Sequence, residues 1–113
     1  MHRDDRAVQF ASDNNAGITP EAIEALARAN VGHAIGYGAD RWTRAAEDAI
    51  RRVFDADVPV FLVFTGTAAN ALALASICRS TDAVVCHEFA HVAVDECGAC
   101  EALTGGAKLL TVG

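Results

Sequence analysis

Two short motifs combine residues that could do chemistry, and the first is FTGTAAN, residues 64–70. It lies between an apolar run and a helical pattern, at the place where open α/β sheets bind their ligands. The first amides of a helix and its dipole favour an anion, Gly66 allows a close backbone approach, and Thr67 adds a hydroxyl. The motif therefore predicts an anion site. A plain turn with Thr67 as the helix N-cap is the alternative reading.

The second motif is HEFAH, residues 87–91, which matches the zinc-hydrolase pattern of two histidines one helical turn apart with a glutamate between them. It follows directly on the strand-like AVVC, and no N-cap or helical period precedes His87. The acidic residues downstream are too close in sequence to supply a third ligand from a separate helix: Asp95, Glu96 and Glu101. We therefore expect that His87 and His91 share no metal. Two polar histidines without a chemical role remain an alternative.

Four cysteines, at positions 78, 86, 97 and 100, include one CxxC pair. A redox pair would begin a helix after a strand in a thioredoxin-like unit, and a zinc site would need a second pair at similar spacing. Neither context is present in the sequence. The pair is therefore expected to be two reduced, buried thiols that behave as small hydrophobic residues.

The elements that must position these motifs can be read from periodicity and from turn residues. Thr19-Pro20-Glu21 has the N-cap, first-turn proline and acid of a helix start. The run PVFLVF shows no alternation, as expected of a strand buried on both faces. The expected order is helix 20–30, loop 31–40, helix 41–54, strand 59–64, helix 68–79, strand 83–86, a Gly105-Gly106 turn and strand 107–112. This order predicts an α/β fold with a mostly parallel sheet and flanking helices.

Composition and charge exclude several classes of function. With 52% hydrophobic and 21% charged residues, the chain is expected to fold around a core. A net charge of −6 without a basic cluster argues against nucleic-acid or anionic-membrane partners. No apolar stretch approaches the length of a membrane span, and the charged first six residues argue against a secretory signal. We therefore expect a cytoplasmic protein.

Taken in order, several segments together resemble the low-specificity L-threonine aldolases, which are fold type I pyridoxal-phosphate (PLP) enzymes of the β-eliminating lyase group. The segments are SDNNAGI (12–18), VGHAIGYGAD (31–40), VFTGTAANALAL (63–74), CHEFAHVAVDECGA (86–99) and GAKLLTV (106–112). The resemblance covers nearly the whole chain from about residue 9 and reaches the first third or so of such an enzyme. It implies a PLP-dependent transferase-like large domain and a homodimer or homotetramer.

The resemblance also implies roles for single residues around the cofactor. Gly66 and Thr67 match the residues that hold the PLP phosphate. His91 matches the histidine that stacks on the pyridine ring and that acts as a base or positions a water. Glu96 matches an acid beside that histidine and is taken with it as a catalytic residue.

Two further residues are matched to the substrate side of the site. Ser12 matches a residue that binds the substrate carboxylate. Tyr37 lies in the loop that reaches toward a neighbouring subunit's site. His33 has no counterpart that can be assigned, because its loop departs by one residue from the commoner family pattern.

The family's Schiff-base lysine matches no position in this chain. Lys108 is the only lysine, and it lies in the expected last strand. We therefore expect residues 1–113 to be part of the PLP-binding large domain, with an arm, helix and loop in 1–40 and the start of the sheet in 41–113. The isolated chain is not expected to cleave threonine.

The sequence thus predicts a PLP-dependent carbon–carbon lyase, here as an incomplete chain. It would cleave L-threonine-like β-hydroxy-α-amino acids to glycine and an aldehyde. Two alternatives remain open at this stage. One is a zinc hydrolase fragment that uses HEFAH, and the other is a catalytically inactive truncated homologue.

Overall fold

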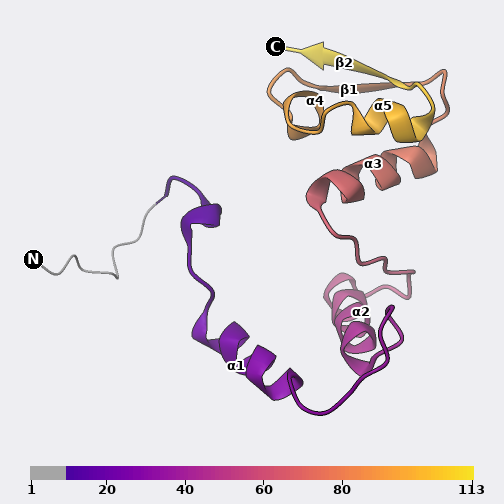
Figure 1. Cartoon of the computed structure of the whole chain (residues 1–113). Helices are drawn as coiled ribbons and strands as arrows, with labels where there is room; N and C mark the ends of the chain where they lie inside the picture. The colour runs from indigo at the N-terminus through magenta and orange to yellow at the C-terminus, as the bar shows by residue number, and fades with distance from the viewer. Residues whose placement is uncertain (1–9) are drawn as a thin grey trace, which may run out of the picture. The chain divides into compact units, whose positions relative to one another are not determined.

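The computed structural model describes residues 10–113, which form two compact units that divide between Ala56 and Asp57 (Figure 1). Each unit is described by itself. Within the described residues, none of the helices has the length and apolar character needed to cross a bilayer.

Within residues 10–56, the N-terminal unit contains two α-helices and a short 3-10 turn. The turn η1 covers Asp13–Asn15, α1 covers Pro20–Ala29 and α2 covers Arg41–Phe54. The Thr19 hydroxyl accepts a hydrogen bond from the Ala22 amide, which confirms the helix start expected from Thr19-Pro20-Glu21. Residues 31–40 form the loop that the sequence predicted.

The start of α2 is fixed by a cap that the sequence pattern did not single out. One oxygen of Asp40 accepts from the amides of Trp42 and Thr43, and the other accepts from the Thr43 hydroxyl. The hydrogen bonds from Thr43 and Trp42 hold the pKa of the Asp40 carboxyl below its ordinary value. Asp40 therefore stays ionised at the positive end of the helix dipole, where a negative charge is favourable.

The C-terminal unit contains three helices and two strands. They are α3 (Gly66–Ile77), β1 (Ala83–His87), α4 (His91–Val94), α5 (Ala99–Thr104) and β2 (Lys108–Val112). The two strands pair in parallel, in register from Ala83 opposite Lys108 to His87 opposite Val112. The crossover between them consists of α4 and α5 and ends at Gly105, which has the positive φ of 75° that glycine adopts readily. The α/β class expected from the sequence is confirmed.

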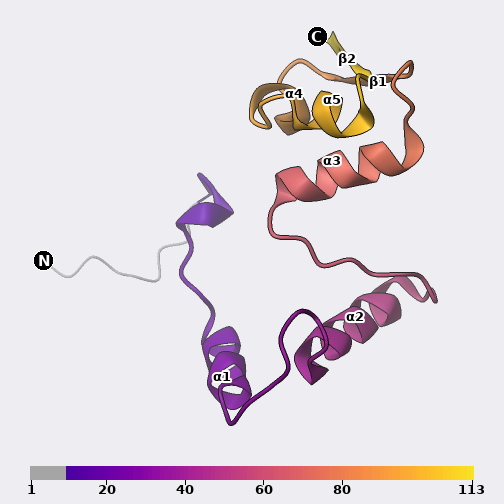
Figure 2. The same cartoon turned by 45° about the vertical axis from the view of Figure 1, so that its right-hand side comes forward.

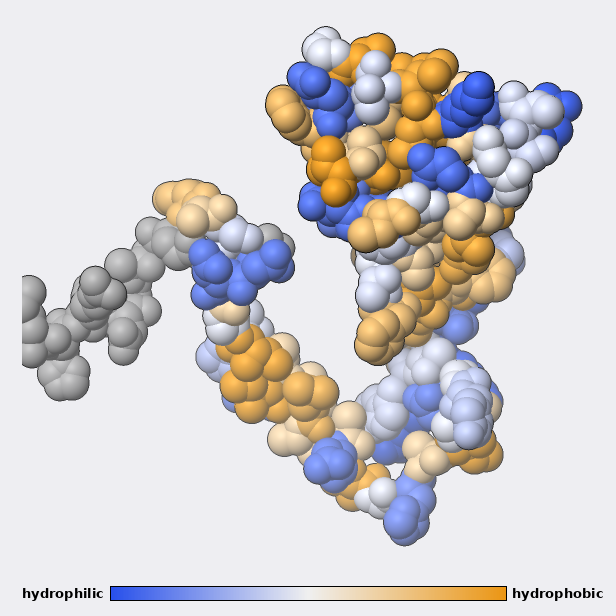
Figure 3. Space-filling model, turned by 45° about the horizontal axis from the view of Figure 1, so that its top comes forward, coloured by the Kyte–Doolittle hydropathy of each residue, from blue (hydrophilic) through white to orange (hydrophobic). Residues whose placement is uncertain are grey.

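This unit is layered on one side of its sheet. In both views α5 lies between the strands and α3, and α4 lies over the N-terminal end of α3 (Figures 1 and 2). The residues that are fully buried there are small, namely Ala71, Cys100 and Ala107, which allows helices and strands to approach closely. The apolar side chains of Val85, Leu110 and Val112 are 67%, 49% and 53% exposed, and hydrophobic residues form a band on this unit in Figure 3.

The segment 59–64 differs from the prediction, because it is not a strand. Residues 57–63 have no regular secondary structure, and the side chains of Phe61 and Phe64 are 83% and 100% exposed. A strand is defined by hydrogen bonds to a neighbouring strand, and within residues 10–113 only β1 and β2 pair with each other. The apolar run showed that the segment suits a buried strand, but it carried no information about a pairing partner.

The expectation for the CxxC pair holds for one of its two thiols. Cys100 is fully buried on α5, and burial raises the pKa of its thiol above the ordinary value. Cys97 is exposed and adopts a left-handed conformation with φ of 51°. The reason is that Cys97 lies in the turn that separates α4 from α5, where the backbone reverses and its side chain points away from the core.

Candidate active site

The residues matched to the cofactor and to the catalytic histidine all belong to the C-terminal unit. Gly66 and Thr67 begin α3, His91 begins α4, and Glu96 lies in the turn before α5. Ser12 and Tyr37 belong to the N-terminal unit and are described there.

The N-terminus of α3 is capped by Thr65. Its hydroxyl accepts a hydrogen bond of 3.1 Å from the Ala68 amide, so the plain-turn reading with Thr67 as the cap is wrong by two residues. The amides of Gly66 and Thr67 donate to no group among the described residues. A Cβ atom built on Gly66 would meet no heavy atom within 4 Å. Two unused donors and open space at the start of a 12-residue helix fit an anion such as a phosphate.

His91 is held by a carboxylate on its own segment. Its Nδ1 lies 2.8 Å from Oε1 of Glu96, and the side chain of Glu96 is fully buried while that of His91 is 61% exposed. The Nδ2 amide of Asn70 on α3 donates to the same Oε1 at 2.6 Å. Since a carboxylate only accepts hydrogen bonds, Nδ1 of His91 carries the hydrogen and Nε2 is the remaining ring nitrogen.

These contacts set the charges of both groups. The hydrogen bonds from His91 and from Asn70 hold the pKa of Glu96 below its ordinary value of 4.5. The hydrogen bond to Glu96, supported by the charge of Asp95, raises the pKa of His91 above its ordinary value of 6.5. At neutral pH the pair therefore consists of an ionised glutamate and a histidine that holds its proton more tightly than a free one.

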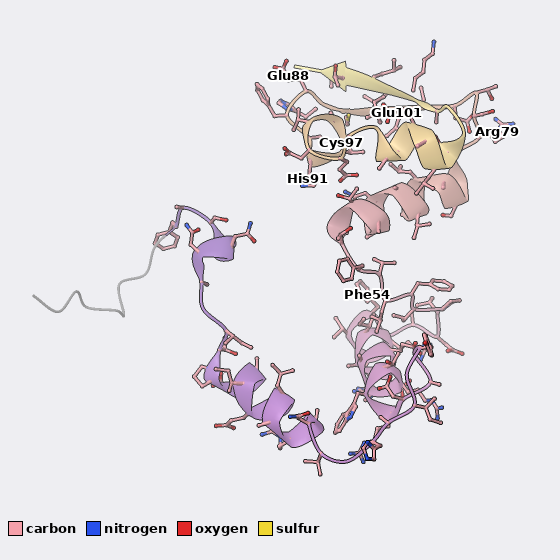
Figure 4. The ribbon with its side chains drawn as sticks, viewed as in Figure 1. Phe54, Arg79, Glu88, His91, Cys97 and Glu101 are labelled. Atoms are coloured by element: carbon pink, nitrogen blue, oxygen red, sulfur yellow. The ribbon has the colours of Figure 1, made fainter. Side chains whose placement is uncertain are left out.

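A concavity of about 390 Å³ lies beside His91. Its lining residues come from α3, β1 and α4 and are Asn70, Ala73, Leu74, Val84, Ala90, His91 and Val92. The His91 side chain extends from the start of α4 on the side of α3 (Figure 4). Except for Asn70 and His91 the lining is apolar, so an aromatic ring could contact it without leaving polar groups unpaired.

The HEFAH motif does not have the geometry of a zinc hydrolase. His87 is the last residue of β1 and His91 is the first of α4, so the two histidines are not on one helix. The Nδ1 atom of His87 accepts a hydrogen bond from the Phe89 amide, and its ring contacts that of Phe89 at 5.5 Å. Residues 10–113 contain no group of three or more His, Cys, Asp or Glu side chains placed to hold a metal ion.

Ser12 and Tyr37 occupy turns in the N-terminal unit. The Ser12 hydroxyl accepts from the Asn14 amide at 3.2 Å, and its carbonyl accepts from the Asn15 amide. Tyr37 has a φ of 61°, which is rare for a bulky residue, and its side chain is fully exposed.

One polar residue of the site, Asn70, received no role from the sequence. It is the last residue of FTGTAAN and lies one helical turn after Gly66 and Thr67, on the same face of α3. That spacing was the available signal. Its partner Glu96 is 26 residues away in sequence, so the pairing itself could not be read from the motif.

Comparison with known proteins shows the family of this chain. Residues 9–113 match the model of the beta-eliminating lyase family, and the chain belongs to that family. It is 54% identical over 107 residues to the low specificity L-threonine aldolase of Pseudomonas sp. (strain NCIMB 10558), and 55% identical over 106 residues to that of Pseudomonas aeruginosa.

The coverage of these relatives is uneven. The two matches include 95% and 94% of this chain but 31% of each relative, so the chain spans about a third of their length. The solved structure of the Leishmania major threonine aldolase is 29% identical, with a TM-score of 0.74 over 87% of this chain and 28% of that one. The resemblance to the threonine aldolases and the fold type I architecture are therefore confirmed, and the family implies PLP as cofactor.

Proposed function

We propose that the protein to which this chain belongs is a PLP-dependent aldolase. It would cleave L-threonine-like β-hydroxy-α-amino acids to glycine and an aldehyde. The observation that carries the proposal is the identity of 54–55% to two low specificity L-threonine aldolases across nearly all of this chain. The hydrogen-bonded pair His91–Glu96 beside a helix N-terminus with unused amides supports it.

When bound, PLP supplies a dianionic phosphate and an electron sink for the cleavage. The amides of Gly66 and Thr67 would bind the phosphate, with the Thr67 hydroxyl as an additional donor. His91 would contact the ring and, through Nε2, accept the proton of the substrate hydroxyl. A histidine can do this only in its neutral form, so the acceptor is present above the raised pKa of His91.

Glu96 would keep the His91 ring in a fixed orientation with the hydrogen on Nδ1. The buried carboxylate would also stabilise the positive charge that the ring acquires when it takes up a proton. On the substrate side, Ser12 would bind the carboxylate and Tyr37 would reach toward the site of a neighbouring subunit. These two assignments rest on the family match alone.

The direct test is to purify the whole protein to which this chain belongs, rather than residues 1–113 alone, and to incubate it with PLP and L-threonine or L-allo-threonine. Glycine and acetaldehyde should appear in equal amounts, and the reaction should depend on PLP. The variant His91→Ala should lose PLP retention and turnover together. Absence of cleavage of any β-hydroxy-α-amino acid, aryl-serines included, would refute the proposal.

The proposal includes a cytoplasmic homodimer or homotetramer that has neither nucleic acid nor a membrane as a partner. The family resemblance motivates the assembly, and four free cysteines suit a reducing compartment. Light scattering of the purified protein tests the assembly, since a monomer would contradict it.

A further inference from the structure

We propose that Asn70 is a positioning residue that holds Glu96 in the orientation in which it binds the His91 ring. The inference deepens the proposed function, because it rests on His91 as the residue that contacts cofactor and substrate. The geometry that carries it lies entirely within the C-terminal unit.

The first observation is that one oxygen of Glu96 carries both hydrogen bonds. Oε1 accepts from Asn70 at 2.6 Å and from His91 at 2.8 Å. Oε2 is buried and has no hydrogen-bond partner among the described residues. Burying a carboxylate is unfavourable unless it is hydrogen-bonded. The hydrogen bonds from Asn70 and His91 are therefore the ones that stabilise the charge of Glu96.

The two donors are not equivalent. Asn70 and His91 are both exposed residues, so exposure does not distinguish the two donors, but His91 belongs to a helix of only four residues. Asn70 belongs to a 12-residue helix and directly precedes Ala71, which is fully buried. Asn70 is therefore the donor with the fixed position, and the more mobile ring aligns on the carboxylate that Asn70 holds.

The place of Asn70 on α3 connects this network to the phosphate end of the site. Because it follows Thr67 by three residues and Gly66 by four, it lies on the same face of the helix. Asn70 and His91 also line the same concavity. The helix that offers its first amides to the phosphate thus also fixes the orientation of His91 through one side chain.

Few other charges act on His91. Glu96 and Asp95 are the acidic groups that influence it, while α3 contains no titratable residue at all. Other titratable residues on the neighbouring elements include His87 at the end of β1 and Cys100 and Glu101 on α5. A change in His91 titration after substitution on α3 must therefore come through Glu96, since α3 itself carries no charge to remove.

The test follows the His91 ring by NMR in the protein without cofactor or substrate. The variant Asn70→Leu keeps the volume of the side chain and removes the donor. The His91 pKa should fall toward 6.5, and the neutral ring should lose its preference for hydrogen on Nδ1. If this variant does not fold, Asn70→Ala, with the best helix-forming residue, serves in its place.

Two comparisons separate positioning from a general loss of structure. Ser76→Ala removes an exposed hydroxyl on the same helix and should leave His91 unchanged. In a Glu96→Gln background, Asn70→Leu should have no further effect on His91, because Asn70 acts through that carboxylate.

The outcomes are distinct from a failure of the proposed aldolase activity, since the titration needs neither PLP nor threonine. An unchanged pKa and ring tautomer in folded Asn70→Leu would refute the positioning role. A rise in the His91 pKa would also refute it, because it would mean that Asn70 competes with His91 for Oε1.

Discussion

Replacing Thr65 by alanine removes the hydroxyl that caps α3, the helix proposed to bind the PLP phosphate. The lost bond, 3.1 Å from the hydroxyl to the Ala68 amide, is exposed, and such a cap is worth about 1 kcal/mol. Without it, the first turn of α3 frays and the amides of Gly66 and Thr67 are no longer held in place. Bound phosphate must then restore the turn, so up to the whole cost appears in the affinity for PLP.

A cost of about 1 kcal/mol corresponds to a dissociation constant about fivefold higher. The measurement is a PLP titration of the purified variant, followed by absorbance, beside a urea unfolding curve. Thr65→Ser keeps the capping oxygen and should bind PLP like the wild type.

Thr19→Ala is the matched control. It removes the corresponding cap of α1, a bond of 3.3 Å to the Ala22 amide, in the other unit of the chain. It should therefore cost similar helix stability and leave PLP affinity unchanged. If Thr65→Ala and Thr19→Ala have the same effect on PLP affinity, the start of α3 is not the phosphate site.

Three further predictions concern the same unit. In Glu96→Gln the His91 pKa should fall toward 6.5, so the acid limb of the rate profile should move to lower pH, and an unmoved limb would contradict the pairing. The stability contributed by the His91–Glu96 pair should be greatest between pH 4.5 and 6.5, because it is lost as pH falls through the lowered Glu96 pKa and as it rises through the raised His91 pKa. Unfolding curves of wild type and His91→Ala, measured from well below pH 4.5 to well above pH 6.5, check it, and a difference that stays constant over that wider range would count against it. Thr104→Val should lower the free energy of unfolding by about 2 kcal/mol, because the Ala107 amide would be left unpaired. In the wild type the buried Thr104 hydroxyl accepts from that amide and donates to the Cys100 carbonyl. Thr104→Ser keeps the hydroxyl and should retain most of the stability.

The sequence predictions that the structure confirms concern short-range features of the chain. Thr19-Pro20 marked the start of α1 because the cap bond spans three residues and the proline ring presets the first turn. Gly105-Gly106 marked a turn, and in the structure Gly105 adopts the left-handed conformation that ends α5. The unpaired amides of Gly66 and Thr67 could be foreseen for the same reason, since the first amides of a helix have no partner within it; that they bind an anion stays a prediction.

The features that the sequence did not predict correctly depend on how the chain is arranged in three dimensions. The apolar run 59–64 suited a strand, but strand formation requires a neighbouring strand, and the run is irregular in this structure. HEFAH matched a one-helix pattern, yet the chain turns after His87, so the two histidines belong to different elements.

The same distinction applies to the residues of the candidate site. The sequence itself, through its motifs and their resemblance to a family, identified His91 and Glu96 as a pair five residues apart. Only the tertiary structure brought Asn70 to the same carboxylate oxygen, across 26 residues. Glu96 lies in the turn before α5, the helix that packs against α3, and its carboxylate is buried, so each of its hydrogen bonds contributes more than it would in water.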